Sequence, residues 1–182
     1  KFTDASPIMM GFVWHYLVRL WAGQGGMFLL HLIMEWSGLS LIAVTLRKLN
    51  YERGNLIFLV GLWPPVFVNS STVWKDVGFN SAAILLSGLA FFLLYGRERK
   101  KIVIGGMAVV SFFVAYYAGT IRHNSAIIIV PLLSLLIYAL LVRWNKLTGK
   151  SMLAAFLGLA VVGIYLTLNH IWTVRLVHKR SN

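Results

Sequence analysis

The chain has 182 residues, of which 59% are hydrophobic and only 12% are charged. A soluble domain carries about 45–50% apolar and about 25% charged residues, and a small one has too little interior to bury the surplus. Disordered chains are poor in apolar residues, so the composition excludes disorder and indicates an integral membrane protein. The absence of cysteine excludes disulfides, thiolate metal sites and a cysteine nucleophile.

The first apolar segment, residues 8–21, contains Arg19 and several bulky aromatic side chains. It is shorter than the roughly 17–25 residues that a transmembrane helix needs, so it predicts an interfacial or re-entrant helix. Six apolar runs between charged loops follow and are expected to cross the membrane. They are Met27–Leu46, Leu56–Val68, Val77–Tyr95, Ile102–Gly119, Ser125–Val142 and Ser151–Leu168. The predicted fold is therefore an all-α membrane protein, with one polytopic domain over residues 1–182.

The positive charges are distributed unevenly between the loops. Three alternate loops, 47–55, 96–101 and 143–150, contain ten Lys and Arg residues, whereas the intervening loops, 69–76 and 120–124, contain one each. Because cytoplasmic loops are enriched in Lys and Arg, the first set is predicted to face the cytoplasm and the second to face outward. Most of the net charge of +12 is then a topology signal, which argues against a nucleic-acid partner. We expect a multi-pass protein of the cytoplasmic (inner) membrane.

The predicted topology also bears on the start of the chain, which is Lys rather than Met. It puts Lys1 on the outward side with no transmembrane helix before it. We therefore expect a piece of a longer protein with at least one upstream helix, although a cleaved signal peptide also explains the start.

Trp74-Lys75-Asp76 directly precedes a predicted span on the outward side. One interpretation is structural, because a carboxylate in the first helical turn is stabilised by the helix dipole and accepts hydrogen bonds from free amides. The other interpretation is functional: Lys75 binds an anionic ligand, and Asp76 orients that ligand or holds a divalent cation. Pro64-Pro65 interrupts the preceding apolar run, and irregular backbone in a membrane usually lines a protein cavity.

Two further outward segments carry polar side chains, the turn Arg122-His123-Asn124 and the N-terminal turn with Asp4. Asn124 suits a helix N-cap, and Arg122 either reaches lipid headgroups or binds phosphate through its guanidinium group. His123 is either simply solvated or titrates near neutral pH. Asp4 either caps the following helix or acts as a general base at the membrane surface.

His31 and Glu35 lie four residues apart in the first predicted span and share one face of the helix. A charged acid at the centre of a membrane helix costs about 2.5–3.5 kcal/mol, so we expect Glu35 to point into the bundle with His31 nearby. The pair either forms hydrogen bonds within itself or to another helix, or lines a proton or ion pathway. Gly105-Gly106, Gly158 and Gly163 are expected to permit close helix packing.

The outward motifs follow one another in an order that is typical of a known class of enzymes. Asp4 with Pro7 precedes an amphipathic helix, Pro64-Pro65 precedes Trp74-Lys75-Asp76, and Arg122-His123-Asn124 precedes the next span. This order, over about residues 1–130, resembles bacterial multi-pass glycosyltransferases of the GT-C type. The resemblance implies sugar transfer on the outer face of the membrane from a polyprenyl-phosphate donor.

The resemblance also implies roles for single residues. Asp4 would be the catalytic base and Asp76 the organising carboxylate, while Lys75 and Arg122 would bind the donor phosphate as it gains charge. His123 and Asn124 would be further substrate-binding residues, and the N-terminal helix would flank a groove for the prenyl tail. The resemblance names no metal ligand and no certain cofactor, and a divalent cation stays open.

Two other functions remain open at this point. The first is a non-enzymatic membrane subunit or a transporter, in which His31 and Glu35 form the path and the outward charges are helix caps and headgroup contacts. The second is a lipid-linked oligosaccharide polymerase or ligase, which keeps the outward cations but uses another donor. The sequence names neither the sugar nor the acceptor, the oligomeric state nor any partner chain.

Overall fold

The computed structural model describes residues 8–96, 100–121, 125–143 and 160, and every regular element within them is helical. Seven α-helices and one short 3-10 turn, η1, are found there. Their bounds are α1 Ile8–Leu20, α2 Gly25–Lys48, η1 Gly54–Ile57, α3 Phe58–Leu62, α4 Pro64–Ser70, α5 Lys75–Tyr95, α6 Lys101–Ile121 and α7 Ala126–Arg143. The predicted all-α class is confirmed.

Three of the described helices, α2, α5 and α6, are long and apolar enough to cross a membrane. They have 24, 21 and 21 residues. At 1.5 Å per residue they extend over about 32–36 Å, which exceeds the roughly 30 Å of a bilayer core. The apolar part of α7, Ile127–Arg143, is shorter. The expected number of about six spans is not confirmed, and the last of them, Ser151–Leu168, lies outside the described residues.

The predicted span Leu56–Val68 is not a single helix, which corrects the sequence-based expectation. Trp63 has φ −57° and ψ 127°, an extended conformation that separates α3 from α4. A proline ring disfavours the helical conformation in the residue before it, and Pro64 itself suits the first position of a new helix. The run therefore folds into helices of five and seven residues, neither of which is long enough to span.

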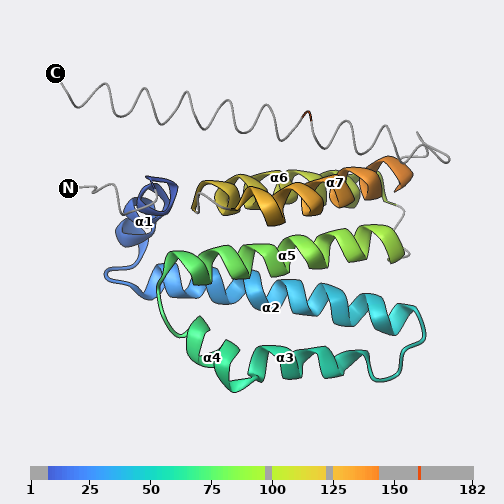
Figure 1. Cartoon of the computed structure of the whole chain (residues 1–182), viewed down its shortest axis with the longest axis horizontal. Helices are drawn as coiled ribbons and strands as arrows, with labels where there is room; N and C mark the ends of the chain where they lie inside the picture. Colours follow the sequence, from blue (N-terminus) through green and yellow to red (C-terminus); the bar gives the residue numbers. More distant parts are fainter. Residues whose placement is uncertain (1–7, 97–99, 122–124, 144–159, 161–182) are drawn as a thin grey trace.

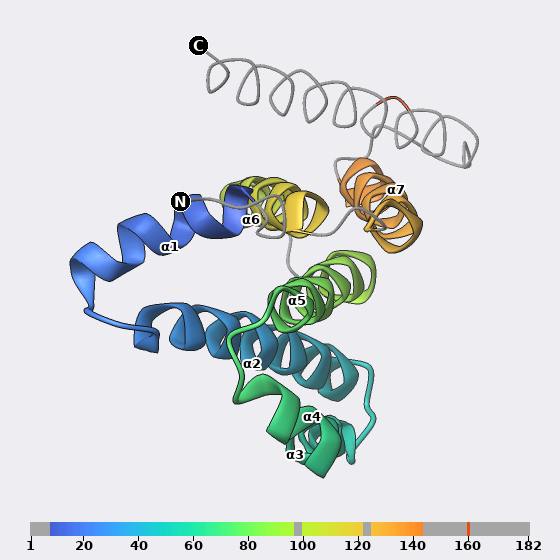
Figure 2. The same cartoon turned by 60° about the vertical axis from the view of Figure 1, so that its left-hand side comes forward.

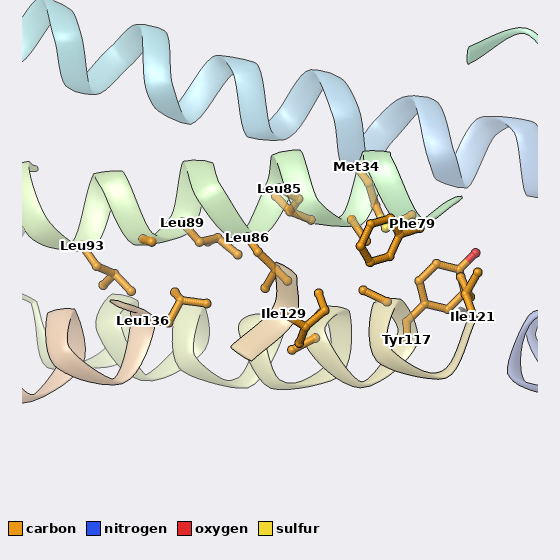
Figure 3. Packing of buried hydrophobic residues seen from close by; sticks show 14 of the residues in the cluster. Met34, Phe79, Leu85, Leu86, Leu89, Leu93, Tyr117, Ile121, Ile129 and Leu136 are labelled. Carbon is orange, nitrogen blue, oxygen red and sulfur yellow. The ribbon is translucent and has the colours of Figure 1, made fainter. Parts of the chain in front are cut away.

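Helix α5 is the centre of the bundle. It lies between α2 on one side and α6 and α7 on the other, while α3 and α4 pack on α2 away from α5 (Figures 1 and 2). Helices α3 and α4 lead the chain from the end of α2 back to the end of the bundle where α2 began. Helix α5 therefore runs in the same direction as α2, and α6 runs in the opposite direction. Figure 3 shows leucines of α5 facing side chains of α6 and α7, and these residues form the apolar core. They are Leu86, Leu89 and Leu93 of α5, Tyr117 and Ile121 of α6, and Ile129 and Leu136 of α7.

Helices α2 and α5 approach each other closely at two glycines. A Cβ atom on Gly38 would lie 2.6 Å from the backbone oxygen of Ile84, and one on Gly88 would lie 2.5 Å from the backbone oxygen of Gly38. Small residues at such crossings let two membrane helices approach closely. Gly105-Gly106 was expected to serve this purpose, and the described helices do not use the pair in that way. Among the described residues, no atom lies within 4 Å of a Cβ atom added to either glycine.

The charged segments gather at one end of the bundle, here named the cationic end. Its described parts are loop 47–55, the start of α6 with Lys101 and the end of α7 with Arg143 (Figure 1). The Arg143 guanidinium donates hydrogen bonds to the backbone carbonyls of Leu93 and Leu94 at the end of α5. These described parts share one end, as the topology prediction requires. Residues 97–99 and 144–150 lie outside the described part of the chain.

Candidate functional site

The opposite end of the bundle, here named the site end, contains the starts of α2 and α5 and the end of α6 (Figure 1). Lys75 and Asp76 are the first two residues of α5, and Trp74 precedes them with an extended backbone, φ −117° and ψ 156°. The Lys75 side chain is exposed and that of Asp76 is half-buried. The predicted place of Asp76 in the first helical turn is confirmed, and there the helix dipole stabilises a carboxylate.

A buried hydrogen bond joins α2 to α6 next to these residues. Nε2 of His31 lies 2.9 Å from the hydroxyl of Tyr117, and both side chains are buried. A Cβ atom on Gly78 would lie 2.7 Å from that nitrogen and 3.0 Å from that hydroxyl. Gly78 of α5 therefore leaves the space in which the two polar groups meet. The other ring nitrogen of His31, Nδ1, is buried without a hydrogen-bond partner among the described residues.

Glu35 has a buried side chain and forms a second polar contact, one turn further along α2 and with a different helix. Its side chain is 3% exposed, and its Oε2 accepts a hydrogen bond of 2.6 Å from the hydroxyl of Ser70 at the end of α4. The prediction that Glu35 points into the protein is confirmed. His31 and Glu35 bond to different helices, and no hydrogen bond between the two is found in the described residues.

Helix α1 lies across the site end and is not parallel to the long helices (Figures 1 and 2). Its 13 residues match the helix predicted over 8–21 and extend about 20 Å, too short to cross a bilayer. The exposed rings of Phe12 and Tyr16 pack edge to face, with centroids 4.9 Å apart, and Arg19 lies 5.7 Å from the Tyr16 ring. Gly23 lies in the turn before α2 and has φ +89°, a backbone conformation that residues with a side chain rarely adopt.

An open apolar hollow of about 500 Å³ lies over α4 and the start of the loop that leads to Lys75. It is lined by Pro64, Pro65, Val68 and Thr72. Pro64-Pro65 was expected to give irregular backbone beside a cavity. The break before Pro64 agrees with that expectation, whereas the hollow along one face of α4 is shallow and open and is not an enclosed cavity.

The structure brings together only part of the predicted site. Lys75 and Asp76 are neighbours at the start of α5, whereas Asp4 and Arg122-His123-Asn124 lie outside the described residues. Their convergence with Lys75 stays a prediction. In the described part of the chain, no group of three or more His, Asp or Glu residues is arranged to hold a metal ion.

Sequence reasoning missed Tyr117, Gly78 and Ser70 as members of the polar contacts. A tyrosine inside a predicted span was a usable signal, because a buried phenol hydroxyl usually finds a hydrogen-bond partner. Gly78, one turn into a span, also indicated a close approach. Neither signal names the partner, which depends on how the helices are rotated against each other.

Comparison of the chain with models of known protein families, with curated proteins and with solved structures finds no significant match. The geometry of the site end therefore carries the functional argument.

Proposed function

We propose that this chain is part of a membrane enzyme that transfers a sugar from a polyprenyl-phosphate donor to an acceptor on the outward face of the membrane. The observation that carries the proposal is the pairing of an exposed Lys75 with Asp76 in the first turn of a central helix, at the end away from the cationic loops. The order of motifs that resembles GT-C glycosyltransferases supports the same reaction.

The chemistry of Lys75 suits a leaving group that is a lipid phosphate. When the bond to the sugar breaks, the phosphate gains negative charge, and a cation already in place stabilises that charge. The start of α5 adds a partial positive charge from the helix dipole. Arg122 would contribute a second cation with a forked donor geometry that fits phosphate oxygens. These features support an anionic ligand at the site end.

The two carboxylates would serve the acceptor. An acceptor hydroxyl must lose a proton as it attacks the anomeric carbon, and a carboxylate within hydrogen-bond reach can accept it. Asp4 would act as this base, and Asp76 would orient the reacting groups or hold a divalent cation. His123 and Asn124 would complete the substrate-binding surface.

An apolar hollow on the segment that precedes Lys75 supports a lipid-linked ligand rather than a soluble one. The hollow on α4 is lined by two prolines and a valine, and it opens beside the loop that leads into the first turn of α5. A polyprenyl phosphate has one charged end and one long apolar end, and such a ligand is matched by a cation next to an apolar surface.

The arrangement of His31 and Glu35 favours a transferase over a transporter. A transport path needs polar groups that follow one another at mid-membrane depth. Here His31 bonds to α6 and Glu35 bonds to α4, so the two side chains contact different neighbours. A lipid-linked oligosaccharide polymerase or ligase would share the outward cations and differ in the donor that it accepts.

The test is transfer of labelled sugar from a polyprenyl-phosphate donor by the full-length protein in proteoliposomes. We expect Asp4→Asn to lower the rate by about 10²–10⁴-fold, as for loss of a general base. Asp76→Asn and Lys75→Gln should each lower it as well. The matched controls are Glu52→Gln and Lys101→Gln at the cationic end, which should retain the rate. Full transfer by both Asp variants would show that neither carboxylate is the base, and absence of transfer from any such donor would overturn the proposal.

A further inference from the structure

The buried contact between His31 and Tyr117 connects two helices that lie on different sides of α5. His31 belongs to α2 and Tyr117 to α6, and their side chains meet where Gly78 of α5 has no side chain. Both groups are inside the protein, with His31 only 1% exposed. The three helices therefore come together at one hydrogen bond.

The hydrogen bond between His31 and Tyr117 contributes little to the stability of the bundle. Hydrogen bonds between membrane helices shift an equilibrium by about threefold on average, because the separated helices also find partners. The Gly38 and Gly88 crossing and the apolar core of α5 already join the helices along their length. In addition, Nδ1 of His31 is buried without a hydrogen-bond partner among the described residues, which works against stability. Apolar side chains would fill the same space without this cost.

A hydrogen bond differs from an apolar contact because it fixes direction and distance. The 2.9 Å separation of His31 Nε2 and the Tyr117 hydroxyl limits how far α2 and α6 can move relative to each other while the bond is kept. Gly78 lies beside this bond, since a Cβ atom added to it would come within 3.0 Å of both polar atoms. Gly78 follows Lys75 by three residues and Asp76 by two on the same helix. A shift or rotation of α5 at Gly78 therefore moves Lys75 and Asp76 with it.

We propose that His31 and Tyr117 are positioning residues, which hold the first turn of α5 through Gly78 and thereby set the direction in which Lys75 and Asp76 face. The position of α5 follows from the contacts above, and the effect on sugar transfer rests on the proposed function. Tyr117→Phe removes the hydroxyl and keeps the ring, so it tests the bond with little change in packing. Tyr138→Phe on α7 is the matched control, because Tyr138 is 39% exposed whereas Tyr117 is buried.

The first readout needs no enzymatic activity. The chain has no cysteine, so spin labels can be placed on Lys75→Cys and Ile127→Cys without removing other thiols. Both sites are exposed and lie at the site end, one on α5 and one on α7. We expect one narrow distance distribution in the parent protein. Tyr117→Phe should raise the population of other distances by about 3–20-fold, the range for loss of one hydrogen bond between membrane helices.

Two more variants keep the test decisive if Tyr117→Phe folds poorly. His31→Leu removes the bond from the other side and should broaden the distribution in the same way. Gly78→Ala puts a methyl group 2.7 Å from His31 Nε2 and should broaden it too. Adding Tyr117→Phe to Gly78→Ala should then have little further effect, because the bond is already broken. Unchanged distributions in all three single variants would overturn the proposal.

The second readout is kinetic and uses the unlabelled full-length protein. In Tyr117→Phe we expect kcat per folded molecule to fall about 3–20-fold with KM for the donor unchanged, whereas Tyr138→Phe should match the parent. A purely structural role would lower the yield of folded protein and leave kcat per molecule unchanged, which would overturn the positioning role. If the parent protein transfers no sugar, the proposed function fails, and the distance measurements still decide whether the bond holds α5.

Discussion

The two ends of the bundle use polar residues in opposite ways. At the cationic end the charges lie in loops and helix termini, where Arg143 donates to backbone carbonyls and Lys48 lies 5.1 Å from the Phe92 ring. Toward the site end, two hydrogen bonds, one buried and one partly buried, join side chains from different helices. Arg143 and Lys48 at the first end contact backbone carbonyls and an aromatic ring, and none of these contacts joins two polar side chains. Polar groups at the second end act through particular partners, which is the arrangement that a binding or catalytic site needs.

The largest expected effect concerns the α2–α5 crossing on which both ends depend. Gly88→Val should destabilise the protein by about 3 kcal/mol or more, because a backbone atom and not a mobile side chain blocks the added carbons. The matched control is Gly106→Val on α6, where a Cβ atom meets open space. Unfolding of both purified variants in detergent micelles measures the difference. Equal stability of the two variants would contradict the close crossing.

The next effect concerns the hydrogen bond between Glu35 of α2 and Ser70 of α4. Ser70→Ala should destabilise the protein by about 1–3 kcal/mol, because it leaves the buried Glu35 carboxyl without this donor. Ser71→Ala is a close control, since the exposed Ser71 hydroxyl, one residue past α4, donates to the nearby Val68 carbonyl. The same unfolding measurement compares them. If Ser71→Ala lowered the free energy of unfolding as much as Ser70→Ala, the hydrogen bond to Glu35 would contribute nothing to stability.

The smallest effect is expected at the cationic end. Arg143→Gln removes two partly buried hydrogen bonds to the end of α5 and should cost about 0.5–1.5 kcal/mol, because water can reach the freed carbonyls and replace part of what the bonds contribute. Lys101→Gln, at an exposed residue, should leave the midpoint of thermal unfolding unchanged. If Arg143→Gln were more harmful than Ser70→Ala, the contrast between the two ends would be wrong.

The sequence predicts the features of the fold that depend on composition and order along the chain. The helical class and the common end of the described cationic segments follow from apolar runs and from counts of Lys and Arg. The number of membrane-spanning helices cannot be counted from the apolar runs alone. Length and hydropathy do not show that the chain leaves the helix at Trp63, although Pro64-Pro65 marked the place.

For the candidate site, the sequence predicts where single residues lie but not which residues they contact. The place of Asp76 follows from its position before an apolar run, and the burial of Glu35 follows from the cost of an exposed acid in lipid. The partners of His31 and Glu35 depend on which faces of four helices meet. The sequence also does not show which glycines lie between helices. Helices α2 and α5 cross at Gly38 and Gly88, whereas no described atom lies within 4 Å of a Cβ atom added to Gly105 or Gly106.

The most direct test of the central claim is to determine which side of the membrane each end of the bundle faces. Because the chain has no cysteine, Lys75→Cys and Arg53→Cys each give a protein with a single thiol, at the site end and at the cationic end respectively. Intact cells are treated with a maleimide that cannot cross the membrane, before and after permeabilisation. We predict that Lys75→Cys is labelled in intact cells and that Arg53→Cys is labelled only after permeabilisation. Labelling of Arg53→Cys but not Lys75→Cys in intact cells would contradict the account, because the site end would then face the cytoplasm.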